Sequence, residues 1–158
     1  MKKLALLVSG SGTNMQAVMD ACQSGEIDGR IAVVISSNHE AYALVRAQGA
    51  KIPNFVCAKK DFPSVEARDR EILRLLKTYD VDYVILAGYL GILPDFIIKE
   101  YENRIVNIHP ALLPKFGGHD FYGIHVHKAV IDAGETESGA TAHFVTSEVD
   151  GGPIIRQE

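Results

Sequence analysis

Asn107 and His109 carry the side chains best suited to chemistry at a carbonyl group. They lie two positions apart in RIVNIH, an apolar run typical of a β-strand, and Pro110 then ends the hydrogen-bond ladder. Side chains two apart on a strand leave the same face, with Cα atoms about 6.5–7 Å apart, while Ile108 points the other way. An amide beside an imidazole can hold the oxyanion that forms when a nucleophile adds to a carbonyl. A lone histidine at a strand end is more often structural, but beside Asn107 we interpret it as part of a reaction site.

The segment SGSGTN, residues 9–14, indicates a second ligand site. Its glycines allow a sharp turn, and the N–H groups of Gly12, Thr13 and Asn14 would then lie at a helix N-terminus, where the dipole favours an anion. A tight turn in which Thr13 or Asn14 caps the helix is an equally open alternative. A dinucleotide site is disfavoured, because Met15 replaces the third glycine of GxGxxG and no carboxylate follows the second strand. Because the GK[ST] ending of a P-loop is also absent, a small phosphate monoester is the better candidate.

Alternating strands and helices must position these residues. Apolar, β-branched runs alternate with helical patterns, which is typical of βαβ units around a mainly parallel sheet. We expect strands over 3–9, 30–37, 52–57, 82–88 and 104–109, with helices over 13–23, 40–48, 64–79 and 94–102. Ligands of open α/β sheets bind outside the carboxyl ends of the strands, where Asn107 and His109 fall.

The longest predicted helix, 64–79, shows one apolar face. Ile72, Leu75, Leu76 and Tyr79 recur at i, i+3, i+4 and i+7. The charged run before them, residues 68–71, is most simply a solvated face. This helix is therefore expected to lie on the sheet.

After Pro114 the pattern changes to a loop, a helix around 125–134 and two short strands within 139–157. The VDGGP turn between those strands carries Asp150, and by itself an aspartate before two glycines indicates a hairpin turn. We therefore predict an α/β, Rossmann-like fold in one domain, residues 1–158. Its mainly parallel twisted sheet has helices on both faces and antiparallel strands at the C-terminal edge.

Composition excludes several classes of function. The formal charge of −4 and pI near 5.8 offer no basic surface for a nucleic-acid partner. Cys22 and Cys57 have no metal-ligand spacing and are expected to be reduced and structural. His125 and His127 have no further ligands at suitable spacing, so we predict no metal. The apolar run LALLV is too short for a signal peptide or a membrane span, which predicts a cytoplasmic protein that binds no membrane.

Four segments together resemble the glycinamide ribonucleotide formyltransferases of purine biosynthesis: VSGSGTNMQA, LAGYLGILP, NIHPALLPKFGG and HFVTSEVDGGPI. The resemblance covers essentially the whole chain in order. It implies the formyltransferase fold, 10-formyltetrahydrofolate as co-substrate and glycinamide ribonucleotide as acceptor, in a monomer or homodimer.

The resemblance also implies roles for individual residues. His109 would stabilise the oxyanion, Asn107 would hold the formyl oxygen and the substrate amine, and Asp150 would pair with His109 and order a proton-shuttling water. The remaining roles are substrate-phosphate binding by Gly12, Thr13 and Asn14, and folate binding by Leu90, Gly91, Ile92, Leu93 and Asn107. The turn 146–150 would add backbone contacts to the folate, and the peptide between Leu113 and Pro114 would be cis.

The sequence departs from the family pattern at two side chains and at its end. Val65 stands where some members carry a basic residue for the folate's glutamate tail, which Arg68 could replace, and Gly91 replaces a common arginine. Members continue through another strand and a helix, so we expect this chain to lack them. Three alternatives stay open: a formyltetrahydrofolate hydrolase, another folate-dependent formyltransferase, and a binding domain without catalysis.

Overall fold

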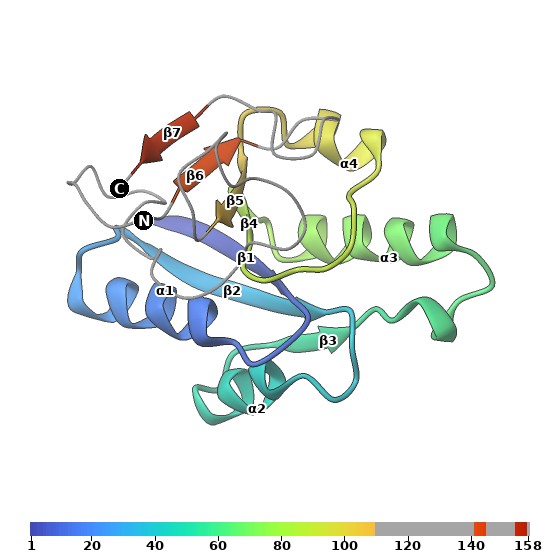
Figure 1. Cartoon of the computed structure of the whole chain (residues 1–158), viewed down its shortest axis with the longest axis horizontal. Helices are drawn as coiled ribbons and strands as arrows, with labels where there is room; N and C mark the ends of the chain where they lie inside the picture. The colour runs from blue at the N-terminus through green and yellow to red at the C-terminus, as the bar shows by residue number, and fades with distance from the viewer. Residues whose placement is uncertain (110–140, 145–153, 158) are drawn as a thin grey trace.

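A computed structural model of the chain describes residues 1–109, 141–144 and 154–157, which build one twisted sheet (Figure 1). The strand order is β3-β2-β1-β4-β5-β6-β7. The strands are β1 (Lys2–Val8), β2 (Gly29–Ser36), β3 (Asn54–Val56), β4 (Tyr83–Leu86), β5 (Ile105–His109), β6 (Thr141–Phe144) and β7 (Ile154–Gln157). Strands β1 to β5 pair in parallel, whereas β6 runs antiparallel to β5 and β7 antiparallel to β6. The predicted parallel α/β core is confirmed, while a single domain over residues 1–158 stays a prediction.

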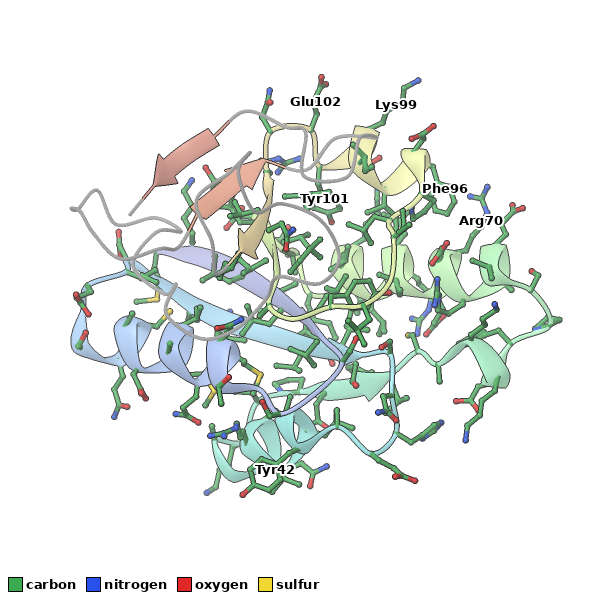
Figure 2. All side chains as sticks on the ribbon, in the orientation of Figure 1. Tyr42, Arg70, Phe96, Lys99, Tyr101 and Glu102 are labelled. Carbon is green, nitrogen blue, oxygen red and sulfur yellow. The ribbon has the colours of Figure 1, made fainter. Side chains whose placement is uncertain are left out.

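Helices cover both faces of the parallel core (Figure 1). They are α1 (Thr13–Ser24), α2 (Tyr42–Gly49), α3 (Val65–Thr78) and α4 (Asp95–Glu100), with a short 3₁₀ helix, η1 (Lys59–Asp61). Alternate residues of β1 point to opposite faces: Leu6 packs in the cluster that includes Met15 of α1, and Leu7 in the one that includes Ile72 of α3. On the second face the guanidinium of Arg70 lies 4.4 Å from the ring centroid of Phe96, which links α3 to α4 (Figure 2).

Helix α3 confirms its predicted apolar face and corrects one expectation. Ile72, Leu75 and Leu76 are buried, and the hydroxyl oxygen of Ser64 caps the helix by accepting from the Ala67 N–H. The charged run was predicted to be a solvated face, which is wrong for Arg68 and Asp69, exposed by only 8% and 4%. These residues lie four and three positions before Ile72, so helical periodicity places them on the same stripe. Each charge is compensated there by the other, with Arg68 Nε 2.9 Å from Asp69 Oδ1.

The order of the strands determines where the candidate site residues lie. β1 is the middle one of the five parallel strands, with β2 on one side and β4 on the other, so the chain reverses its direction of winding at β1. The carboxyl ends of β1 and β4 are therefore neighbours, and the end of β5 follows because Leu86 is paired with Asn107. Such a switch point is the usual ligand crevice of open α/β sheets.

Candidate functional site

The loop after β1 enters α1 without a side-chain cap. Gly12 is the N-cap residue, in the left-handed conformation with φ 82° and ψ 19°, and no side chain of the described residues accepts a capping hydrogen bond there. The Gln16 N–H donates to the Gly12 carbonyl over 2.8 Å and so starts the helix. The alternative to an anion site was a helix capped by Thr13 or Asn14. Because the N-cap residue is Gly12, neither residue caps α1. The first-turn N–H groups have no acceptor within the helix and are oriented as an anion cradle requires.

Helix α2 holds this loop from the side. The Gly10 carbonyl accepts from the Ala43 N–H over 3.1 Å, and the Ser11 carbonyl accepts from Arg46 Nε over 2.8 Å. A Cβ on Gly12 would stand 2.8 Å from the Cα of Ala43, closer than real contacts allow, so glycine is required for the approach as well as for its φ. Arg46 was not among the site residues predicted from the sequence. Its bond to Ser11 joins residues 35 positions apart, and no local pattern signals it.

Asn14 is the one predicted phosphate-loop residue whose side chain is buried. It is 5% exposed, whereas Thr13 is exposed to solvent. Its Oδ1 atom has no hydrogen-bond partner among the described residues. A buried amide oxygen without a partner is unfavourable unless water or a ligand satisfies it, so this residue is suited to a bound molecule.

The predicted folate segment follows β4 and presents both apolar surface and backbone. Leu90 and Ile92 are each 63% exposed, while Leu93 is buried against the α3 and α4 face. Gly88, with φ 75°, makes the turn that leads into the segment. The Leu90 N–H donates to Ser9 Oγ over 2.9 Å. That donor is therefore engaged within the protein, and a pteridine would use other backbone groups of the segment.

The ring of Tyr89 explains why position 91 is a glycine. A Cβ at position 91 would stand 2.7 Å from the Tyr89 ring, so the two side chains compete for one space. Burial raises the pKa of Tyr89 to about 12, and its hydroxyl finds no partner among the described residues. Arg68, considered as a contact for a folate glutamate tail, is instead buried against Asp69, while Val65 is 41% exposed. The sequence prediction for Arg68 is thus not supported by its position.

Asn107 lies near the end of β5, the strand next to β4, and its side chain is half-buried. Ile108 belongs to the core cluster on the α1 and α2 side, which places Asn107 on the opposite face, as the strand period predicted. His109 is the last residue of β5, but its side chain is not among those described. Asp150 and the turn 146–150 lie outside the described residues, as does the Leu113–Pro114 peptide. The contact between His109 and Asp150 therefore stays a prediction.

Three further findings concern the described part of the chain alone. Cys22 and Cys57 are both free, and burial raises the pKa of the Cys57 thiol to about 11. No group of three or more His, Cys, Asp or Glu side chains in residues 1–109, 141–144 and 154–157 could hold a metal ion. His125 and His127 fall outside those ranges. Within them, no helix has the length and apolar character required to cross a membrane.

Comparison with known proteins places this geometry in a family. A family model described as formyl transferase matches residues 2–158. Phosphoribosylglycinamide formyltransferase of Haemophilus influenzae is 45% identical over 157 residues, which span 99% of this chain and 72% of that protein. The crystal structure of glycinamide ribonucleotide transformylase 1 from Symbiobacterium toebii superposes with a TM-score of 0.85 at 42% identity, covering 100% of this chain and 72% of that one.

A formyltetrahydrofolate deformylase from Pseudomonas syringae is also similar, with a TM-score of 0.78 and 33% identity. The match covers 99% of this chain but 50% of the deformylase. Transferase and deformylase relatives thus share the fold described above. The match over nearly the whole sequence, together with the parallel sheet, shows that this chain belongs to the formyl transferase family.

Proposed function

We propose that this chain transfers the formyl group of 10-formyltetrahydrofolate to the amine of glycinamide ribonucleotide, a step of de novo purine biosynthesis. One observation carries the proposal: the predicted phosphate loop and the predicted folate segment lie at neighbouring strand ends, joined by the bond from Leu90 N to Ser9 Oγ. Asn107 lies at the next strand end. The names of the relatives support the same reaction.

The reaction proceeds by direct attack of the amine nitrogen on the formyl carbon. A new carbon–nitrogen bond forms, and the carbonyl electrons move to the oxygen of a tetrahedral oxyanion. Asn107 holds the formyl oxygen and the amine, and the His109 imidazolium stabilises the oxyanion. Collapse of the intermediate breaks the bond to N10 of the folate, which takes up a proton as the amine gives one up. Asp150 keeps His109 protonated and orders the water that carries this proton.

Several groups are needed because none is sufficient alone. One oxyanion donor contributes roughly 2.7–4 kcal/mol, and a placed acid or base about 10²–10⁴-fold. Holding two reactants in register can contribute about 7–11 kcal/mol, the largest single amount. The loop of Gly12, Thr13 and Asn14, by binding the phosphate, fixes one reactant and so takes part in catalysis. The mechanism places no metal ion in the site.

Hydrolysis of the formyl folate is the second candidate, and the similarity to a deformylase favours it. Water would then replace the amine and formate would be released. Such a reaction has no need of the uncapped, anion-oriented start of α1. Transfer is therefore the better match to the described loop.

Turnover of 10-formyltetrahydrofolate, followed by absorbance with and without glycinamide ribonucleotide, distinguishes these reactions. We expect deformylation only when the amine substrate is present, with formylated product in equal amount. Deformylation without the amine would identify a hydrolase instead. Binding of both ligands without turnover would identify a non-catalytic domain and reject the proposal. A cytoplasmic location and a monomeric or homodimeric assembly stay predictions from the sequence.

A further inference from the structure

Ser9 is the residue at which three strand ends meet. It follows β1 directly and is 5% exposed. Its Oγ accepts from the Leu90 N–H over 2.9 Å and lies 2.6 Å from the Oγ of Ser37, which follows β2. The Ser37 N–H in turn donates to the Val8 carbonyl over 3.0 Å, so the serine pair is itself held by the sheet. One buried hydroxyl thus connects the ends of β1, β2 and β4.

The chemistry of a hydroxyl suits this junction. Its oxygen has two acceptor positions and one proton. The Leu90 N–H occupies one acceptor position, and the bond with Ser37, with either serine as donor, engages the hydroxyl a second time. Two partners at fixed places leave the Ser9 side chain little freedom to rotate. The position of the Ser9 side chain therefore fixes the position of the Leu90 backbone.

The two segments that Ser9 joins are those assigned to different ligands. Ser9 begins the segment 9–14 that contains the predicted phosphate loop, and the Gly10 and Ser11 carbonyls of this segment are bound to α2. Leu90 begins the predicted folate segment, beyond the turn at Gly88. Among the described residues, the ladder bond from Ala87 N to Leu7 O is followed by the bond from Leu90 N to Ser9 Oγ. The distance between the two ligand loops is thus set beyond the end of the sheet by this hydroxyl.

We propose that Ser9, hydrogen-bonded to Ser37, is a positioning residue. It fixes the predicted phosphate loop and the predicted folate segment relative to each other, so that the acceptor amine meets the formyl carbon. The identities of the two ligands rest on the proposed function. Ser9 touches neither reacting atom and acts through Leu90 and Gly10. If the two loops shift relative to each other, the amine and the formyl carbon no longer meet correctly. This lowers kcat more than it lowers the affinity for either ligand.

The test uses Ser9→Ala, with Ser24→Ala as the matched control. The Ser24 hydroxyl donates to the Ala21 carbonyl at the C-terminal end of α1, whereas the predicted phosphate loop lies at the N-terminal end of that helix. We expect Ser9→Ala to lower kcat roughly tenfold or more, while the KM for each substrate changes less than about threefold. A kcat within twofold of the parent chain would overturn the proposal. A similar fall in Ser24→Ala would also overturn it, because the effect would then be one of general stability.

A second variant, Ser37→Ala, and a measurement that does not depend on turnover test the role of Ser9 independently. Ser37→Ala leaves the Leu90 bond and removes the support of Ser9, so we expect a smaller fall in kcat, of about threefold. Hydrogen exchange of the Leu90 amide, which needs no turnover, should be faster in Ser9→Ala and unchanged in Ser24→Ala. If the parent chain shows no transfer, the proposed function fails. The coupling is then judged from the affinity for tetrahydrofolate with and without inorganic phosphate: phosphate should raise it in the parent chain and not in Ser9→Ala, and equal changes in both would reject the coupling.

Discussion

The side chain of Arg46, on α2, donates from Nε to the carbonyl oxygen of Ser11 in the loop between β1 and α1, over 2.8 Å. The same guanidinium lies 5.1 Å from the ring centroid of Tyr42, at the outer surface of α2 (Figure 2). It also donates to Gln16 Oε1 over 3.3 Å. Arg46 therefore supports the predicted phosphate loop through its side chain, while Ala43 packs against Gly12.

Replacement of Arg46 by methionine should loosen that loop. Methionine keeps most of the aliphatic length but donates no hydrogen bond, so we expect the KM for glycinamide ribonucleotide to rise about five- to tenfold. The KM for the folate should change little. Steady-state kinetics with each substrate varied in turn measures both. Arg70→Met is the matched control, since Arg70 packs on Phe96 of α4 and not on the predicted phosphate loop, and it should leave the KM for glycinamide ribonucleotide unchanged.

Gly12→Ala should lower the free energy of unfolding more than Gly25→Ala. Both glycines have positive φ, 82° and 90°, so both variants carry backbone strain of about 1–3 kcal/mol. A Cβ at Gly25 meets nothing within 4 Å, whereas one at Gly12 stands 2.8 Å from the Ala43 backbone. Urea unfolding should show Gly12→Ala less stable than Gly25→Ala by about 2 kcal/mol. Equal losses would show that α2 yields to the added methyl group.

Asn14→Asp should impair phosphate binding selectively. The position is buried, and a carboxylate there would repel an anion held at the start of α1. We expect the affinity for glycinamide ribonucleotide to fall at least roughly tenfold, with folate affinity retained. Isothermal titration of each ligand separately decides the matter. Asn14→Ser, which keeps a neutral polar group, should lose less; an Asp variant that binds as tightly as the parent chain would exclude phosphate from this position.

His109→Asn tests the catalytic assignment. The lost interaction belongs mainly to the transition state, so kcat should fall by orders of magnitude while folate binding stays largely intact. Single-turnover rates and folate titrations together separate the two effects. Near-normal turnover would show that His109 is a structural residue at the end of β5.

Stability should fall at alkaline pH because of Cys57 and Tyr89. Burial raises their pKa values from 9.0 and 10.0 to about 11 and about 12. The unfolded chain therefore ionises these groups first, and the stability they contribute is complete below pH 9 and lost as the pH rises through 11 and 12. The free energy of unfolding should drop by about 1.4 kcal/mol per pH unit for each group in its range.

Urea titrations at successive pH values follow this slope. Cys57→Ala should flatten it from pH 9 upward, and Tyr89→Phe should flatten it from pH 10 upward. At neutral pH, Tyr89→Phe should be neutral or stabilising, because the hydroxyl it removes has no partner among the described residues. An unchanged alkaline slope in both variants would show that other groups, such as Tyr101, whose pKa is also raised, dominate it.

Local pattern was sufficient for much of this molecule. The apolar run of β1, the 2-residue spacing of Asn107 and His109 on β5 and the 3.6-residue period of α3 predicted these elements and their faces, because each depends only on neighbours along the chain. The glycines of SGSGTN predicted the turn into α1, since Gly12 does adopt positive φ. The same periodicity, applied to Arg68 and Asp69, would have placed them on the core stripe. Their charges led to the wrong prediction of a solvated face.

The tertiary structure alone decided how these parts meet. Strand order is a property of the sheet, so the adjacency of the β1 and β4 ends could not be derived from either strand. The bonds from Arg46 to Ser11 and from Leu90 to Ser9 join residues 35 and 81 positions apart. Polar contacts of that span leave no period or spacing in the sequence, because each depends on the three-dimensional distance between two elements. The sequence by itself predicted which loops bind ligands, and the folded chain determined what holds those loops in place.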